Sequence, residues 1–277
     1  MSLFVTSLNS GSNGNCYYIG NETEAILVDA GISCSEIEKR MQRLGLGMQN
    51  VKAIFISHEH TDHVSGLRVV AKKYQLPVYI TQPTLRFGRL KLDVNLVNTF
   101  APHQAVRIGS LSITAFPKFH DAADPYSFII DCDNIKVGVF TDIGVACENV
   151  ITHFKQCHAA FLETNYDEKM LEQGGYPFVL KNRIRGDKGH LSNTQALELF
   201  IKHKPPFMSH IFLSHLSKNN NSPELVYKLF SEHSDGVKIA VASRDEAMEV
   251  YPINAPAVAS SNNHSYYVPR QLSFAFA

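Results

Sequence analysis

The fold of this chain is decided by the stretch AIFISHEHTDH, which spans residues 53 to 63. Its first five residues are mostly apolar and predict a buried strand. His58 and His60 follow two positions apart, so in an extended segment both side chains point the same way. Asp62 and His63 come where we expect the chain to turn into a helix over residues 64–74. Because imidazole and carboxylate groups ligate zinc, iron or manganese, this strand end predicts a metal site.

Outward from this motif, apolar runs that end in polar turns predict further strands. These runs cover residues 3–8, 16–19, 25–29, 77–81, 111–117, 127–132, 136–141, 159–162, 210–214 and 238–242. The segments between them predict helices over residues 33–44, 83–91, 148–155, 193–203 and 223–230. Strands dominate the first half and the middle of the chain. We therefore expect sheets covered by helices rather than a doubly wound parallel sheet.

The composition limits the class of protein and its partners. The 26 Lys and Arg residues balance 26 Asp and Glu residues, which argues against broad electrostatic capture of nucleic acid but allows a local basic patch. We find no signal peptide and no run long enough to span a bilayer, and the five cysteines lack C-x-x-C spacing. These features predict a cytoplasmic protein with reduced thiols and no membrane partner.

The end of the chain differs in composition from the rest. From about residue 252 onward it turns polar and irregular. We expect one catalytic domain over residues 1–252 and a loosely structured C-terminal tail over residues 253–277. The oligomeric state stays open at this point.

The pattern H-x-H-x-D-H after an apolar strand resembles the signature of the metallo-β-lactamase superfamily. The resemblance implies an α/β fold in four layers, an αββα sandwich of two mixed β-sheets flanked by helices. It also implies single polar residues at the ends of other strands. The chain carries them after apolar runs and in the implied order, as Asp29, His120, Asp142 and His215. The resemblance therefore covers nearly the whole chain.

The resemblance further implies ligands for two divalent metal ions. One ion would take three imidazoles, those of His58, His60 and His120. The other would take Asp62, His63 and His215, with Asp142 bridging the two ions. Asp29 would accept a hydrogen bond that supports the metal loop. The ligand types leave zinc, manganese and iron open as the native metal.

Several branches of the superfamily fit these ligands less well. Zinc β-lactamases of the common two-metal kind place cysteine where Asp142 stands. Flavodiiron proteins use a glutamate where this chain has His60. Glyoxalase-type thioesterases share the ligands but carry a helical C-terminal domain that we do not find in the sequence.

The segment Gly189-His190-Leu191-Ser192 opens the predicted helix over residues 193–203. It resembles the Gly-His-Ser/Thr motif of ribonuclease Z-like enzymes. The resemblance implies that His190 pairs with Asp62 and helps phosphodiester cleavage, and it makes Ser192 a candidate for substrate contact. The alternative is that His190 and Ser192 only cap the helix.

Two further segments are candidates for substrate contact. The loop SGSNGN at residues 10–15 has small residues that leave backbone N–H groups free for an anion, and its candidates are Ser10, Ser12 and Asn15. A basic group before His190 offers Arg183, Arg185 and Lys188 to phosphates, and a second group offers Arg86, Arg89 and Lys91. The alternatives are an ordinary hairpin loop and solvated basic loops.

Taken together, these motifs most resemble the WalJ/YycJ-type bacterial exonuclease branch, regarded as 5′-to-3′ exonucleases on double-stranded DNA. We expect a metal-dependent hydrolase, a phosphodiesterase that shortens DNA through a hydroxide bridging two metal ions. Asp62 would orient the nucleophile, and His190 would donate a proton or hydrogen bond. Two alternatives stay open: a small-molecule phosphodiesterase or thioesterase, and a non-catalytic metal-binding regulator. The intact ligand set argues against the regulator.

Overall fold

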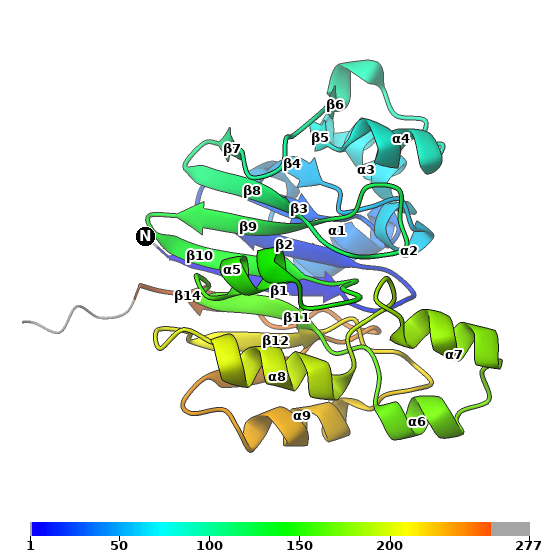
Figure 1. The fold of residues 1–277 in the computed structure, drawn as a ribbon. Helices are drawn as coiled ribbons and strands as arrows, with labels where there is room; N and C mark the ends of the chain where they lie inside the picture. Colours follow the sequence, from blue (N-terminus) through cyan, green and yellow to red (C-terminus); the bar gives the residue numbers. More distant parts are fainter. Residues whose placement is uncertain (1, 256–277) are drawn as a thin grey trace, which may run out of the picture.

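The computed structural model describes residues 2–255, and these residues form two seven-stranded mixed sheets packed face to face (Figure 1). The first sheet has the strand order β14–β1–β2–β3–β4–β5–β6, and the second has the order β13–β12–β11–β10–β9–β8–β7. Helices cover the outer faces of the sheets. The predicted αββα sandwich is confirmed.

Most strands correspond closely to the predicted apolar runs, whereas the strands at Val97–Asn98, Ala105–Ile108 and Tyr251–Ile253 were not expected. Those of the first sheet are β1 (Leu3–Asn9), β2 (Cys16–Gly20), β3 (Ala25–Val28), β4 (Val51–Phe55), β5 (Val78–Tyr79), β6 (Val97–Asn98) and β14 (Tyr251–Ile253). Those of the second sheet are β7 (Ala105–Ile108), β8 (Leu111–Pro117), β9 (Tyr126–Cys132), β10 (Ile135–Phe140), β11 (Ala159–Glu163), β12 (His210–Ser214) and β13 (Lys238–Val241).

The helices begin at polar capping residues in several cases. Ser33 caps α1, and Ser192 forms a capping box with Gln195 at the start of α8, which satisfies backbone donors at both helix starts. The helices are α1 (Cys34–Arg43), α2 (Thr61–Val64), α3 (Leu67–Tyr74), α4 (Gln82–Phe87), α5 (Glu148–Phe154), α6 (Glu168–Gln173), α7 (Phe178–Arg185), α8 (Asn193–His203) and α9 (Pro223–Ser231). Two short 3₁₀ turns, η1 (Met48–Asn50) and η2 (Val94–Leu96), precede strands.

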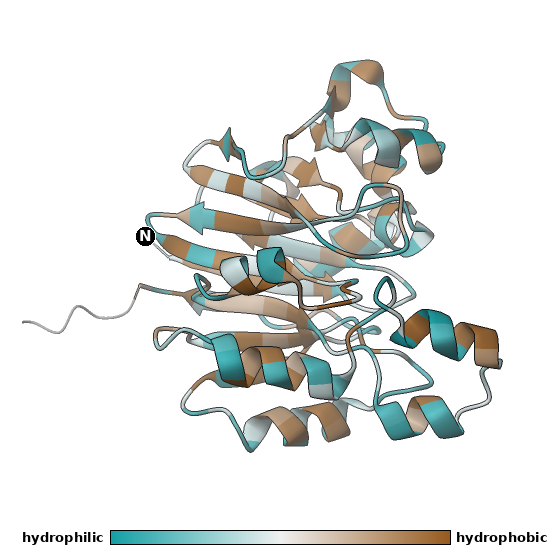
Figure 2. Cartoon of the chain, viewed as in Figure 1, coloured by the Kyte–Doolittle hydropathy of each residue, from teal (hydrophilic) through white to brown (hydrophobic). Residues whose placement is uncertain are grey.

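Aromatic side chains fill the layer between the two sheets. The rings of Phe55 and Phe128 lie 5.8 Å apart, and those of Tyr17 and Phe161 lie 4.9 Å apart. All four side chains are buried, and burial of one such ring contributes about 1.5–3 kcal/mol. Figure 2 shows brown, apolar stretches along the strands and a mixture of brown and teal on the helices outside. This layer fixes the strand ends of one sheet relative to those of the other.

Parallel pairing brings the polar strand ends to one edge of the molecule. β3 and β4 are parallel, and so are β10, β11, β12 and β13. Their carboxyl ends lie toward the side where α2 and α7 are drawn, on the right in Figure 1. Asp29, His58, Asp142 and His215 follow closely after β3, β4, β10 and β12. Residues from distant parts of the sequence therefore meet at this edge.

Some helices differ from the sequence-based predictions. The helix expected over residues 64–74 is divided into α2 and α3 at Gly66, where a Cβ atom would lie 1.9 Å from the carbonyl oxygen of Ile32. Helices α6 and α7 were not expected. The interpretation of the basic segment before His190 as a solvated loop is wrong, because most of that segment forms α7.

The last described strand lies within a few residues of the predicted domain boundary. Ile253 of β14 pairs with Leu3 of β1, so the first sheet extends to this point of the chain. The predicted tail over residues 253–277 lies outside the described residues from residue 256 onward. Within residues 2–255, no helix is long and apolar enough to cross a membrane.

Candidate metal centre

Three residues of the site adopt left-handed backbone conformations directly after strands. Asp29, Asp142 and His215 have φ values of 61°, 54° and 56°. This conformation costs about 1–2 kcal/mol for a residue with a Cβ atom, so the surrounding structure has to hold it. At His215, the backbone N–H donates to the buried hydroxyl of Ser10 over 2.8 Å. The chain thereby turns sharply after each strand, which directs Asp142 and His215 into the site and Asp29 toward Ser57.

Three imidazoles converge at the end of β4. His60 Nδ1 lies 3.1 Å from His58 Nε2 and 3.3 Å from His120 Nε2. Ligand nitrogens at about 2.1 Å around a tetrahedral ion are about 3.4 Å apart, so these separations suit a shared metal ion. Burial lowers the pKa of His58 well below its usual value and that of His120 to about 3. Both rings are thus neutral, the form that binds a metal.

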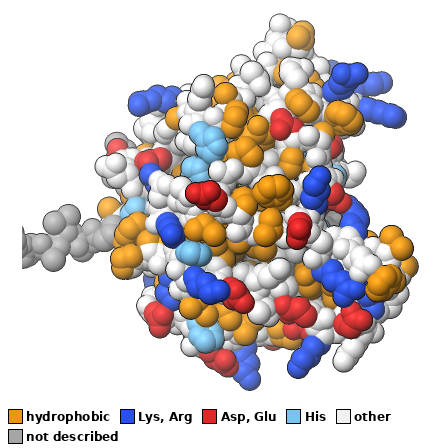
Figure 3. Space-filling model, viewed as in Figure 1, with side chains coloured by type: hydrophobic (Ala, Val, Ile, Leu, Met, Phe, Trp, Pro, Cys, Tyr) orange, Lys and Arg blue, Asp and Glu red, His pale blue; other side chains and the backbone are white. Residues whose placement is uncertain are grey.

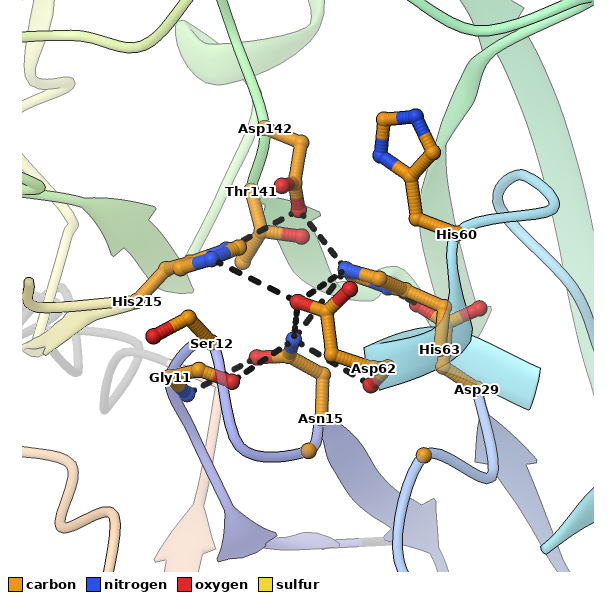
Figure 4. A network of polar contacts seen from close by, with 12 residues as sticks. Gly11, Ser12, Asn15, Asp29, His60, Asp62, His63, Thr141, Asp142 and His215 are labelled. Atoms are coloured by element: carbon orange, nitrogen blue, oxygen red, sulfur yellow. Dashed lines mark hydrogen bonds and ion pairs between the residues drawn. The ribbon is translucent and has the colours of Figure 1, made fainter. Parts of the chain in front are cut away.

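A second group of side chains surrounds His63. His63 Nε2 lies 3.4 Å from Asp62 Oδ2 and 3.3 Å from Asp142 Oδ2, and His215 Nε2 lies 3.8 Å from Asp62 Oδ2. Figure 4 shows these four side chains pointing toward one another. Asp142 also lies 3.7 Å from His120 Nε2 and so stands between the two groups. Their donor atoms suit divalent cations.

Charge balance supports the same conclusion about divalent cations. Burial raises the pKa of the Asp142 carboxyl, but His215 and His63 bring the pKa well below its usual range. Burial lowers the pKa of His63, but Asp142, Asp62 and Asp29 raise the pKa well above its usual value. Three carboxylates therefore surround one imidazole in a buried space. Positive charge at this place stabilises them, and a divalent cation can supply it.

Asp29 holds the metal loop rather than facing the centre. Its carboxylate accepts hydrogen bonds from the backbone N–H and the hydroxyl of Ser57, each over 2.8 Å. Its Oδ2 atom also lies 2.8 Å from His63 Nδ1. The Nε2 atom of His63 therefore faces Asp62 and Asp142. An orienting carboxylate of this kind fixes the ring of a metal-ligating histidine.

His190 reaches the site in a different pairing from the one expected. Among residues 2–255, no hydrogen bond or ion pair joins His190 to Asp62; its Nδ1 atom lies 2.7 Å from Glu163 Oε1 instead. The ring lies 5.2 Å from that of His120 and 5.4 Å from that of His215. The expected pairing with Asp62 is wrong because the start of α8 lies beside the end of β11, which carries Glu163.

Glu163 is the site residue that the sequence analysis missed. It is fully buried, and its Oε2 atom accepts hydrogen bonds from the N–H groups of Ile143 and Leu191. Burial lowers the pKa of His190, but Glu163 raises the pKa above its usual value. The signal that could have identified Glu163 is a charged residue at the end of an apolar strand. Asp29 and Asp142 lie one and two residues after their strands and give a similar signal.

The loop at residues 10–15 supports the metal loop. Asn15 Nδ2 lies 3.2 Å from Asp62 Oδ2 and 3.1 Å from His63 Nε2, as Figure 4 shows in part. The N–H groups of Ser10, Gly11, Gly14 and Asn15 all donate within the protein. The expectation that the loop leaves N–H groups free is therefore wrong for these four residues. The Ser10 hydroxyl is buried against Tyr17, whereas Ser12 is exposed.

The remaining candidates for substrate contact are divided between the interior and the surface. Ser192 is buried as the cap of α8. Arg183 pairs with Asp121, and Arg185 pairs with Glu172 and lies over the ring of Phe178; Lys188 is exposed. Figure 3 shows hydrophobic side chains beside basic ones over α7, at the right-hand edge of the molecule. These basic residues border the site without entering it.

Comparisons with known proteins bear on this centre. Residues 10–144 match the family model of the metallo-beta-lactamase superfamily. The chain is 34% identical to the exodeoxyribonuclease YycJ of Bacillus anthracis over 88% of its own length and 96% of the relative. It is 32% identical to the exodeoxyribonuclease WalJ of Streptococcus pneumoniae, over 79% and 84% of the two chains. The metallo-beta-lactamase fold protein YhfI from Bacillus subtilis superposes with a TM-score of 0.68 at 16% identity, over 91% of this chain and all of the other.

Proposed function

The chain belongs to the metallo-β-lactamase superfamily of hydrolases, and from this premise we propose that it shortens double-stranded DNA from the 5′ end as a metal-dependent exonuclease. The observation that carries the proposal is the convergence of His58, His60, Asp62, His63, His120, Asp142 and His215, with His190 beside them. The relatives named exodeoxyribonuclease match the chain over most of its length. A nucleic acid is therefore the substrate class that fits the site best.

We propose two divalent ions as cofactors. His58, His60 and His120 would hold one ion, and Asp62, His63 and His215 the other, with Asp142 between them. When bound, such ions supply a nucleophile at neutral pH and neutralise charge on phosphoryl oxygens. The imidazole and carboxylate donors suit zinc, manganese or iron.

The protein side chains have separate roles in this proposal. Asp62, whose side chain is 22% exposed, would orient the attacking water toward phosphorus. His190 faces Glu163 through Nδ1, which leaves Nε2 for a substrate phosphate or for the leaving oxygen. Glu163 would position His190, and Asp29 would position His63. These two buried carboxylates act through the residues that they hold.

Contacts to the DNA backbone are proposed at the border of the site. Arg183, Arg185 and Lys188 lie at or just after α7, and Arg86, Arg89 and Lys91 lie in and after α4. Each of these helices also exposes a phenylalanine, Phe178 at 69% and Phe87 at 70%. Basic side chains position phosphates, and exposed rings can stack on bases at a frayed end.

The test is a metal-dependent assay of labelled duplex DNA beside bis-p-nitrophenyl phosphate and an RNA duplex of the same sequence. Stepwise shortening of DNA from the 5′ end, abolished by chelation and restored by manganese or zinc, is the expected outcome. Turnover of the dye substrate alone would identify a small-molecule phosphodiesterase. No turnover of any substrate by the metal-loaded protein would favour a binding protein, and full DNA turnover without metal would exclude the proposed chemistry.

A further inference from the structure

Lys118 is a buried lysine to which the proposed reaction assigns no role. It follows β8, lies two residues before His120 in the chain, and is 6% exposed. Its Nζ atom donates a hydrogen bond to the backbone carbonyl oxygen of Thr141 over 2.6 Å. Within residues 2–255, no ion pair ties this ammonium to a single carboxylate. A buried charge without a direct partner is destabilising, so its wider surroundings have to stabilise it.

The Thr141 carbonyl places this ammonium close to the carboxylate that is proposed to lie between the metal ions. Thr141 is buried and directly precedes Asp142 in the chain. Figure 4 shows the two residues as neighbours, with the Asp142 carboxylate directed toward His63 and His215. The Lys118 ammonium therefore lies beside the residue that joins the two groups of proposed ligands, without belonging to either group.

Four carboxylates of the centre act on the Lys118 side chain. Burial lowers the pKa of Lys118 from its usual value, whereas Asp142, Asp29, Glu163 and Asp62 raise it, in this order of strength. The usual pKa of lysine lies about three units above neutral pH, and neighbouring negative charges favour the charged form. The positive charge is thus shared among the four carboxylates.

This charge has opposite effects on the two states of the metal centre. Without metal ions, buried carboxylates repel one another, and a nearby ammonium reduces the repulsion. With divalent ions bound, the ammonium repels these ions, and the repulsion is strong where water is excluded. The ammonium also acts on proposed ligands of one ion, because burial lowers the pKa of His58 and of His120 and Lys118 lowers both further.

We propose that Lys118 is an internal counter-charge of the metal centre, which stabilises the metal-free protein and weakens the binding of the metal ions. The inference rests on the proposed metal ions and not on the proposed substrate. A chain with this lysine can fold before metal arrives, since one of its negative charges is already balanced. Metal ions that bind less tightly also exchange more readily.

The first experiment measures metal affinity by competition with a chromogenic chelator, using zinc and manganese. We expect Lys118→Met to lower the Kd for metal at least about tenfold, since it removes the repelling charge. Lys118→Gln should change the Kd in the same direction, because glutamine can donate a hydrogen bond to Thr141 but carries no charge. Lys118→Arg keeps the charge and should stay within about threefold of the wild type. Lys228→Met, exposed on α9, is the matched control and keeps the wild-type Kd.

The second experiment measures Tm for the same proteins, once with excess chelator and once with excess metal. A tenfold change in Kd corresponds to about 1.4 kcal/mol, which is about 3–5 °C for a chain of this size. We expect Lys118→Met to fall below the wild type in chelator by at least this much more than it does in metal. Comparing the two conditions removes any change in packing that the substitution causes in both states.

Two results would overturn the inference. One is a Kd for metal that is unchanged in both Lys118→Met and Lys118→Gln. The other is weaker metal binding in Lys118→Met together with wild-type binding in Lys118→Gln, because this result would assign to Lys118 only the hydrogen bond with Thr141.

Neither measurement uses DNA, so the inference and the proposed function can fail separately. Tighter metal binding by Lys118→Met and Lys118→Gln would support the counter-charge even if the wild-type protein shortens no DNA. An unchanged Kd in both variants would overturn the counter-charge even if the wild-type protein is an active exonuclease.

Discussion

His60 has surroundings unlike those of the other imidazoles in the metal centre. It is partly exposed, and its ring lies 4.6 Å from that of His58 and 5.1 Å from that of His120. We expect His60→Ala to lose metal and activity together, with a fall in turnover of about 100-fold or more. Elemental analysis and the DNA assay on the same sample measure both. His233→Ala, exposed after α9, is the control; a variant that keeps activity after losing metal would contradict the ligand role.

Substitution of His190 or Glu163 should affect metal content and kcat differently from substitution of a metal ligand. We expect His190→Ala to keep the metal content and to lower kcat by about 10²–10⁴-fold, the usual range for a general acid. Glu163→Gln should lower kcat by about 10–100-fold, because an orienting partner is weakened. The double variant should be no slower than His190→Ala, since Glu163 acts through His190. Additive losses would assign Glu163 an independent role; Glu198→Gln, exposed on α8, is the control.

At the scale of residues, most of the candidate ligands of the metal centre could be predicted from the sequence, because they belong to a recognisable pattern. Asp142 and His215 were identified through the resemblance to the metallo-β-lactamase signature, which implies single polar residues at the ends of apolar runs in a fixed order. Glu163 could not be. Its significance depends on a particular neighbour, His190, and pairing across distant strands is invisible in one sequence.

At the scale of elements, the exposed helix α7 differs from the helices that cover the sheets. None of its residues is buried, and Phe178 and Val179 are 69% and 79% exposed. α1 and α8 were predicted from an apolar face or a capping signal, and α7 lacks both. A helix without a buried face leaves no periodic pattern, so the sequence suggested a loop there. Its side chains are available for a ligand instead.

This exposure leads to a prediction about salt dependence. Arg185→Ala and Lys188→Ala should each weaken DNA binding across all sequences and reduce the slope of log K against log salt by about one. The measurement is a fluorescence titration of duplex DNA at several salt concentrations. Arg43→Ala, exposed in α1, should keep the wild-type slope. Unchanged slopes in all variants would show that α7 does not contact phosphates.

At the scale of the whole molecule, the metal centre joins the two sheets. Asp29 and His58–His63 follow strands of the first sheet, whereas His120, Asp142 and His215 follow strands of the second. Ions held between them would connect both halves of the sandwich. We expect chelation to lower Tm by at least about 5 °C, from a loss of roughly 2.7 kcal/mol at a hundredfold excess over Kd. Thermal scans with and without added zinc or manganese measure this, and equal Tm values would argue against such a link.

Two truncated chains would test the boundary of the catalytic domain. We propose that the described residues suffice for the fold, so a chain ending at Ala255 should keep its metal content and its Tm within about 2 °C. A chain ending at Glu249 lacks β14 and the buried Ile253, and it should be less stable by about 2–5 kcal/mol. Urea unfolding of both proteins measures the difference. Loss of stability in the longer protein would assign a structural role to residues beyond 255.

The pairing of β14 with β1 has a consequence for protein synthesis. Leu3 emerges from the ribosome long before Ile253, its partner in the sheet. At about 5–20 residues per second, the outer edge of β1 waits for tens of seconds for its neighbour. An unpaired strand edge recruits other strands during that interval. Translation speed and chaperone supply should therefore govern how much protein reaches the native state in a cell.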